Sequence, residues 1–152
     1  MKLLVTQELG RLCKWLRILG IDASYIRSNN LSEIIFSAIR ESRIIITRNR
    51  RLAEHPGLKM VLIKSDFLKE QLRQILDELK IEIRLEEMFM RCIICNEVLR
   101  EVEKEKVKDL VPEYVFNTQE NFVECPKCKR IYWQGTHWGN VRHYLEEIGS
   151  SA

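Results

Sequence analysis

Four of the five cysteines stand in two pairs of identical spacing, Cys92-x-x-Cys95 and Cys125-x-x-Cys128. Each pair presents two thiolates from one tight turn, and two such turns supply the tetrahedral four-sulfur shell that Zn²⁺ prefers in structural sites. An odd number of cysteines with this spacing favours metal ligation in a reducing compartment over a disulfide framework. A closed four-cysteine shell has no position open for water or substrate, so we predict a structural zinc ion without a catalytic role.

Four carboxylates near the ends of expected strands form a second group of residues that could take part in catalysis. They are Glu8, Asp22, Glu33 and Asp66. Carboxylates that converge at the carboxyl edge of a parallel sheet would hold Mg²⁺ or Mn²⁺ for phosphodiester hydrolysis, in which the metal activates water and neutralises developing charge. Glu33 and Asp66 also have a structural interpretation as first-turn or capping acids that complement a helix dipole. The sequence leaves both interpretations open.

Six basic residues are the counterpart of these acids: Arg11, Lys14, Arg17, Arg48, Arg50 and Arg51. Three of them fall within four residues, directly after a buried strand, and three lie along the first expected helix. Arginines in such a loop, joined by the exposed face of a helix, would bind a phosphate backbone. The alternative is an ordinary solvated surface. Residues 1–88 contain 16 Lys/Arg and 12 Asp/Glu, whereas residues 89–152 contain 9 and 10, so the basic excess lies in the first part.

An aromatic pair, His137-Trp138, follows the second cysteine pair. The two side chains could stack on a nucleobase, or the histidine could act as an acid or base. Such pairs more often pack a small module, and we prefer the structural interpretation.

The elements that position these residues are predicted from apolar patterning. Unbroken apolar runs at Lys2–Thr6, Ile44–Thr47 and Met60–Ile63 are typical of strands covered on both faces, and Ala23–Ile26 is a weaker strand. Helical periodicity fills the intervals and also follows the last strand. The resulting β-α-β-α-β-α-β-α order predicts right-handed crossovers and a three-layer α/β domain with a parallel sheet. Ligands gather outside the carboxyl ends of such strands, where Thr47 to Arg51 would lie.

A domain boundary is expected near residue 88, with an α/β domain at 1–88 and a zinc ribbon with a C-terminal helix at 89–152. Asn121–Glu124 and Arg130–Gln134 read as hairpin strands that flank the second cysteine pair. Residues 107–116 are compatible with an inserted helix or arm, and residues 81–90 with a strand or a linker. Cys13 lies on the apolar face of the first helix and is expected in the core.

Composition bounds the class of protein. Among the 152 residues, 45% are apolar and 31% are charged, which supports a hydrophobic core and a soluble protein. The chain has neither an apolar run long enough to span a bilayer nor a basic-plus-apolar leader at Met1, so we expect a cytoplasmic protein without a membrane partner.

Several motifs occur together in one order along the chain. They are Leu9-Gly-Arg-Leu-Cys-Lys-Trp-Leu-Arg-Ile-Leu-Gly20, Ile46-Thr-Arg-Asn-Arg50, Ser65-Asp66 with Glu70-Gln-Leu72, the two cysteine pairs, and Tyr132-Trp-x-Gly-x-His-Trp138. In these motifs the chain resembles the Mut-seven C-terminal RNase domain family. The resemblance implies a PIN-like nuclease fold with an appended zinc ribbon, RNA as the partner, and metal-dependent ribonuclease activity.

The chain departs from the family pattern at two positions. In that pattern the first strand ends in Asp and the third in Thr-Arg-Asp, whereas this chain has Thr6 and Asn49. Replacing Asp by Asn keeps the shape but removes the charge that binds a hard divalent cation, and Thr is a poorer ligand still. The resemblance therefore implies a reduced catalytic set. Asp66 and Glu33, with Glu8 or Asp22, would hold the metal, Asn49 and Thr6 would position water or phosphate, and Arg48 would stabilise charge.

Two functional hypotheses follow from these observations. The first is an RNA-binding protein of the PIN-like ribonuclease class whose metal-dependent cleavage is weakened by Thr6 and Asn49. The alternative is a protein-interaction module without a nucleic-acid role. Salt-dependent binding of RNA separates them, because phosphate contacts make affinity fall with ionic strength.

Overall fold

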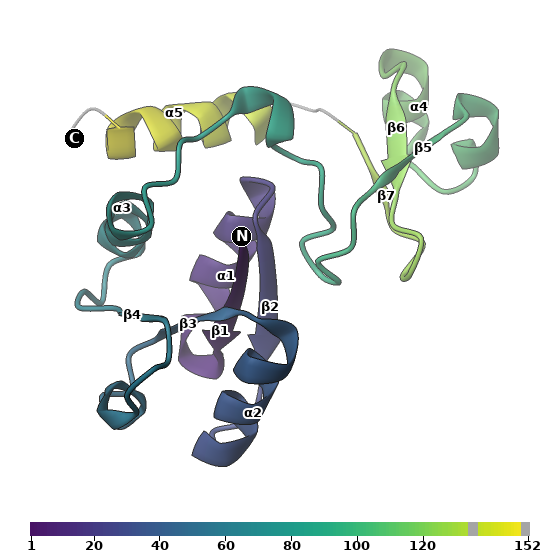
Figure 1. Cartoon of the computed structure of the whole chain (residues 1–152). Helices are drawn as coiled ribbons and strands as arrows, with labels where there is room; N and C mark the ends of the chain where they lie inside the picture. The colour runs from purple at the N-terminus through teal and green to yellow at the C-terminus, as the bar shows by residue number, and fades with distance from the viewer. Residues whose placement is uncertain (134–136, 150–152) are drawn as a thin grey trace. The chain divides into compact units, whose positions relative to one another are not determined.

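The computed structural model describes residues 1–133 and 137–149. The chain divides into two compact units, Met1–Phe89 and Met90–Ala152 (Figure 1). Each unit has a sheet and a hydrophobic core of its own.

A four-stranded parallel sheet forms the centre of the first unit. Its strands are β1 (Lys2–Thr6), β2 (Asp22–Ile26), β3 (Ile44–Thr47) and β4 (Met60–Leu62), in the order β2-β1-β3-β4. Thr6 lies opposite Ile26 and Thr47 lies opposite Leu62, so the carboxyl ends of the strands meet at one edge. The prediction of a parallel α/β sheet is confirmed.

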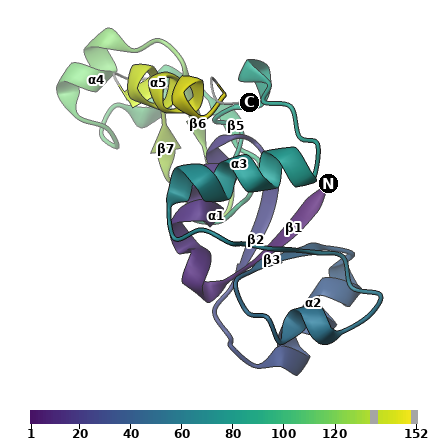
Figure 2. The ribbon, with the colours of Figure 1, turned by 90° about the vertical axis from the view of Figure 1, so that its left-hand side faces the viewer.

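Helices cover both faces of this sheet. They are α1 (Gly10–Ile18), α2 (Leu31–Glu41) and α3 (Leu68–Glu78), with the short 3₁₀ turns η1 (Gln7–Leu9), η2 (Leu52–Glu54) and η3 (Leu85–Glu87). The chain moves from β1 to β2 in one direction along the sheet and from β2 through β3 to β4 in the other. Right-handed connections therefore place α1 on one face and α2 with η2 on the opposite face (Figure 2).

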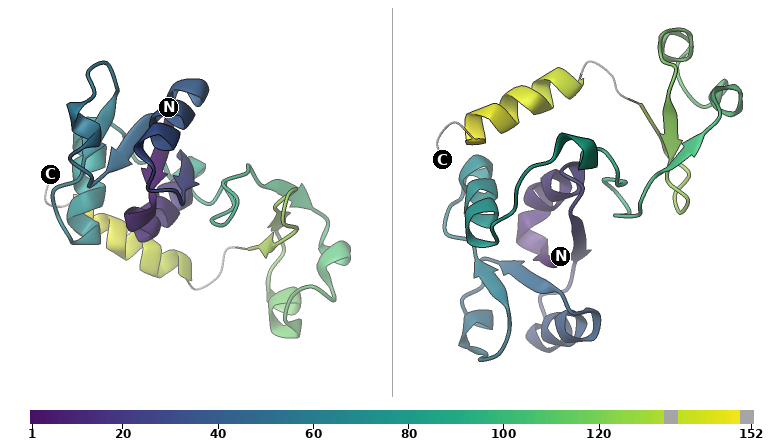
Figure 3. Two further views of the ribbon diagram at one scale, coloured as in Figure 1. Left: turned by 90° about the horizontal axis from the view of Figure 1, so that it is seen from below. Right: turned by 45° about the horizontal axis from the view of Figure 1, so that its top comes forward.

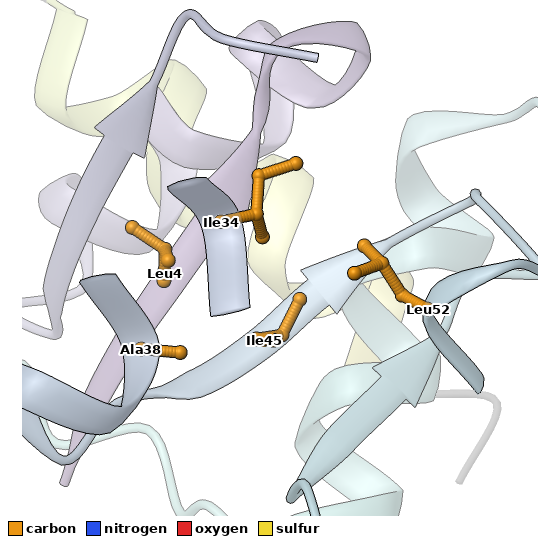
Figure 4. Close-up of a cluster of buried hydrophobic side chains, with 5 residues drawn as sticks. All are labelled: Leu4, Ile34, Ala38, Ile45 and Leu52. Carbon is orange, nitrogen blue, oxygen red and sulfur yellow. The ribbon is translucent and has the colours of Figure 1, made fainter. Parts of the chain in front are cut away.

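The unbroken apolar strands are explained by burial on both faces. Leu4 and Ile45 of the sheet pack against Ile34 and Ala38 of α2 and against Leu52 of η2 (Figure 4). Toward the other face, α1 and α3 contribute fully buried leucines and isoleucines: Leu12, Leu16, Leu72 and Ile75. The sheet is thus the middle of three layers.

Position 20, directly after the C-cap of α1, requires glycine for two physical reasons. Its φ of +86° is a left-handed conformation that side chains disfavour, and a Cβ there would lie 2.2 Å from the Glu87 carbonyl oxygen. The segment that contains Glu87 also donates a hydrogen bond from Phe89 N–H to Ile18 O, at 2.9 Å. Residues 81–90 therefore form no strand; this segment includes η3, and Glu87 and Phe89 contact the end of α1.

The second unit is built on a small antiparallel sheet of β5 (Arg100–Val102), β6 (Phe122–Glu124) and β7 (Ile131–Tyr132), drawn in green in Figure 3. The predicted hairpin strands correspond to β6 and β7. The predicted insertion is η4 (Lys104–Val107) followed by α4 (Glu113–Thr118), and the C-terminal helix is α5 (His137–Gly149). A buried cluster joins the insertion to the sheet: Val107, Val111, Val115 and Phe122.

Strand β5 was not predicted, because its three residues, Arg-Glu-Val, carry no apolar pattern. Within residues 1–133 and 137–149, none of the helices combines the length and apolar character needed to cross a bilayer.

Candidate functional site

A small cavity of about 100 Å³ lies at the carboxyl edge of the parallel sheet. The ends of three strands and the start of α2 supply its lining: Thr6, Gln7, Glu8, Ser28, Asn29, Ile34, Thr47 and Asn49. Among these described lining residues, Glu8 alone carries a charge at neutral pH. The cavity is therefore polar, but it is mostly neutral.

The hydroxyls of Thr6 and Thr47 link the central strands β1 and β3 beside this cavity. Thr6 is 3% exposed, and its Oγ1 lies 2.9 Å from Thr47 Oγ1, 3.0 Å from Glu8 Oε2 and 3.3 Å from the Ile46 carbonyl oxygen. One hydroxyl proton serves one of these acceptors at a time, and the carboxylate is the strongest of them. Thr47 Oγ1 in turn accepts the Asn49 N–H at 3.1 Å. Thr6 thus connects the sheet to Glu8.

Asn49 caps the turn that leads into η2. Its Oδ1 accepts the Arg51 N–H at 3.0 Å, and its carbonyl oxygen accepts the Leu52 N–H at 3.2 Å. A polar side chain that accepts from the backbone two residues later favours such turns, and Asn and Asp both do so. The loop therefore requires an acceptor at position 49, and an aspartate would satisfy the same hydrogen bond.

The cysteine pairs form two turns with the same local geometry. In each pair the second cysteine donates its N–H to the first sulfur at 3.4 Å, from Cys95 to Cys92 and from Cys128 to Cys125. The next residue donates its N–H to the carbonyl oxygen of the first cysteine at 2.9 Å and has a φ of 66° in both turns. Each turn therefore aims two sulfurs at one point.

The four sulfurs fit a structural zinc ion. All four Sγ atoms lie within 4.8 Å of one another, and Cys92 Sγ is 3.7 Å from Cys128 Sγ. A tetrahedron with Zn–S bonds of about 2.3 Å has edges of about 3.8 Å, which matches this spacing. The Tyr132 hydroxyl lies 3.1 Å from Cys92 Sγ and supplies a further hydrogen bond. Such a site would hold the second unit together, because metal-binding free energy becomes folding free energy.

The pKa values of Cys95 and Cys128 are shifted in opposite directions. Partial burial and hydrogen bonds with Cys128 and Cys125 raise the pKa of Cys95 to about 12. Hydrogen bonding by the Arg130 backbone lowers the pKa of Cys128 to about 6, and the Arg130 side chain acts in the same direction. Four adjacent thiolates repel one another, so a divalent cation is the group that allows all four to ionise together.

The sequence model of the Mut7-C RNAse domain matches residues 1–145. This chain belongs to the Mut7-C RNAse domain family. No curated protein and no solved structure gave a significant match to the chain. Membership confirms the resemblance drawn from the sequence motifs, and the four-cysteine cluster accords with the zinc ribbon that the resemblance implies.

Glu33 and Asp66 of this Mut7-C chain do not reach the cavity that Glu8 lines. Glu33 is exposed in the first turn of α2, where its N–H bonds Asn30 Oδ1 at 3.1 Å, as the capping interpretation predicts. The Asp66 side chain is 77% exposed and forms an ion pair with Arg48. Neither residue lines the cavity with Thr6, Glu8 and Asn49.

Asp22 lies at the opposite, amino edge of the sheet. It begins β2 opposite Lys2 and pairs with Arg43 at 2.7 Å. Its expected role as an alternative metal ligand at the carboxyl edge is therefore wrong. Among the side chains that the structure describes, the cysteine set is the only group of three or more Cys, His, Asp or Glu residues close enough to share a metal. Of the four acids named from the sequence, the lining of the cavity thus includes Glu8 alone.

Exposed basic residues follow the ends of three strands, β2, β3 and β4. Arg50 and Arg51 are exposed in the loop after β3 beside Arg48, and Arg11 and Lys14 are exposed on α1. Two further exposed cations, Arg27 and Lys64, follow β2 and β4 and were not predicted. Their position directly after a strand was the available signal.

Arg17 was predicted on the exposed basic face of the first helix, but it is buried. Its side chain is 7% exposed, and its Nε donates to the Ala23 carbonyl oxygen at 2.9 Å. The residue lies one helical turn after Cys13, which is also buried and contacts the same carbonyl oxygen at 3.6 Å. Arg17 therefore stabilises the junction of α1 with β2. The side chains of His137 and Trp138 lie outside the described part of the chain.

Proposed function

We propose that this Mut7-C chain binds single-stranded RNA at the carboxyl edge of its parallel sheet, and that the edge lacks the carboxylates needed for metal-dependent cleavage. One observation carries the proposal. The cavity where the strands end is lined by neutral polar groups and by Glu8, whereas exposed arginines follow the neighbouring strand. A neutral cavity bordered by cations favours phosphate over a divalent metal ion.

The argument against a hard-cation site rests on charge and geometry. Mg²⁺ and Mn²⁺ in phosphoryl-transfer sites are held by carboxylates together with water and substrate oxygens. Thr6 contributes a hydroxyl that already bonds the sheet and Glu8, and Asn49 contributes an amide oxygen that already accepts from Arg51. Neither side chain brings negative charge to the cavity.

The argument for RNA rests on the arginines and on family membership. Arg48, Arg50 and Arg51 lie in one loop, and guanidinium groups bind phosphate oxygens with paired hydrogen bonds. The Mut7-C RNAse domain family implies a nucleic-acid substrate. In this proposal the zinc ribbon is a structural unit whose metal maintains its fold.

Salt-dependent binding tests the proposal. A fluorescent single-stranded RNA is titrated with the full chain at several salt concentrations, and log affinity is plotted against log salt. If each of the three arginines contacts one phosphate, their joint replacement by Ala reduces the magnitude of the slope by about 2, since a single-strand contact contributes about 0.7. The matched control replaces Lys2, Arg40 and Lys59 by Ala, which removes the same charge from the amino-edge side.

Cleavage is measured on the same RNA with saturating Mn²⁺. We expect intact RNA from the wild-type chain under conditions in which it is bound. Cleavage that requires Mn²⁺ and disappears in Asp66→Asn would overturn the second part of the proposal. A wild-type chain that does not retain RNA at low salt would overturn the first part and favour the protein-interaction alternative.

A further inference from the structure

An exposed aromatic ring stands beside the basic loop at the carboxyl edge. Phe67 is 70% exposed and occupies the N-cap position of α3, directly after Asp66. Asp66 forms an ion pair with Arg48, which follows the adjacent strand. The ion pair therefore ties the turn that carries the ring to the loop that carries the arginines.

The turn that presents Phe67 is held by several hydrogen bonds. Ser65 Oγ accepts the Phe67 N–H at 3.0 Å, and the Ser65 hydroxyl bonds the Glu70 carboxylate. The buried Gln71 donates its side-chain amide to the Ser65 carbonyl oxygen at 2.9 Å and its backbone N–H to the Phe67 carbonyl oxygen at 2.9 Å. The ring is therefore displayed by an ordered turn, and the backbone on both sides of it is fixed.

The surroundings of the ring fit a nucleotide better than an apolar protein surface. An apolar interface needs a continuous hydrophobic patch, whereas Lys64, Asp66 and Glu70, all close to Phe67 in the sequence, are exposed acidic or basic residues. A single aromatic face on a turn that is tied to the arginine loop matches a base that stacks on the ring while the adjoining phosphates contact the arginines.

We propose that Phe67 is a base-stacking residue that makes this edge select unpaired nucleotides. The inference rests on the proposed RNA binding and names the residue by which the edge selects single strands, because the bases of a duplex are already stacked and cannot present a face to the ring. Stacking is not electrostatic. It adds affinity without changing the salt dependence that the arginines produce.

The experiment uses the full chain and a single-stranded RNA that contains 2-aminopurine, whose fluorescence is quenched when it stacks. We expect binding of the wild-type chain to change this fluorescence, and Phe67→Ala to abolish the change. We also expect Phe67→Ala to weaken binding about tenfold or more with an unaltered salt slope, and Phe67→Trp to restore affinity. Phe36→Ala is the matched control, because Phe36 is 63% exposed and belongs to α2, away from the turn. A duplex of the same sequence should bind wild type and Phe67→Ala equally.

The outcomes separate this inference from the function on which it rests. If the wild-type chain binds RNA and the triple arginine variant does not, but Phe67→Ala binds like wild type, stacking is refuted and RNA binding stands. Equal weakening by Phe67→Ala and Phe36→Ala also refutes it. Absence of RNA binding by the wild-type chain overturns both. Circular dichroism of each variant verifies that the fold is retained.

Discussion

The substitution Asn49→Asp tests the central claim that charge, and not loop geometry, separates this edge from a metal site. Asn49 Oδ1 accepts the Arg51 N–H at 3.0 Å, and an Asp carboxylate accepts the same bond. Asn and Asp differ by only a few tenths of a kcal/mol as capping residues. The loop should therefore keep its conformation while the lining of the cavity gains a second carboxylate in addition to that of Glu8.

The size of the effect follows from the separation of the two carboxylates. If the two carboxylates lie about 6 Å apart, they repel by about 3 kcal/mol at an effective dielectric constant of about 20. Glu8 is exposed, and solvent screening reduces the cost to about 1 kcal/mol or less. Without a divalent cation we expect the melting temperature of the variant to fall by about 5 °C.

Divalent metal should reverse this loss in the variant only. If Mn²⁺ binds the paired carboxylates with a Kd of about 1 mM, a concentration of about 10 mM stabilises the folded state by about 1.4 kcal/mol. The assay is thermal unfolding of zinc-loaded protein with and without Mn²⁺, for wild type, Asn49→Asp and Asn49→Ala. The alanine variant lacks the cap and the charge, so it should be destabilised by about 1 kcal/mol and should not respond to Mn²⁺.

Two results would refute the reasoning. A wild-type chain that Mn²⁺ stabilises as much as Asn49→Asp would show that the neutral edge already binds the cation. An Asn49→Asp variant that loses stability and does not respond to Mn²⁺ would show that Glu8 and position 49 do not share a site.

Two further predictions concern the hydroxyl network and the cysteine cluster. Thr6→Val should lower the free energy of unfolding by about 1 to 3 kcal/mol in urea titrations, because the buried Thr47 hydroxyl loses its partner at 2.9 Å. The control is Ser37→Ala in α2, which should leave the free energy of unfolding nearly unchanged. Removal of metal by a strong chelator should unfold residues around Cys92 and Cys125 while amide protection in the parallel sheet persists, since each unit has its own core. Simultaneous loss of protection in both units would contradict that independence.

The sequence by itself determined the strands of the parallel sheet and the sulfur site. Uninterrupted apolar runs such as Ile44–Thr47 identified strands, because a strand covered on both faces has no polar side. Glu33 was expected in the first turn of a helix, and its N–H does bond the cap residue Asn30; such a contact joins residues only three apart in the sequence. The two cysteine pairs predicted their cluster for the same reason: most of the geometry lies within each four-residue turn.

Only the tertiary structure decided which polar groups meet. Thr6 and Thr47 are 41 residues apart and bond because β1 and β3 are neighbours in the sheet. Arg17 turned inward because a carbonyl oxygen of β2 lay within its reach, which helical periodicity does not reveal. Asp22 lies outside the cavity because it begins β2 at the amino edge of the sheet. Glu33 lies outside it because it belongs to the exposed first turn of α2. Local patterns follow from chain geometry, whereas the charge of a site depends on side chains that converge from distant segments.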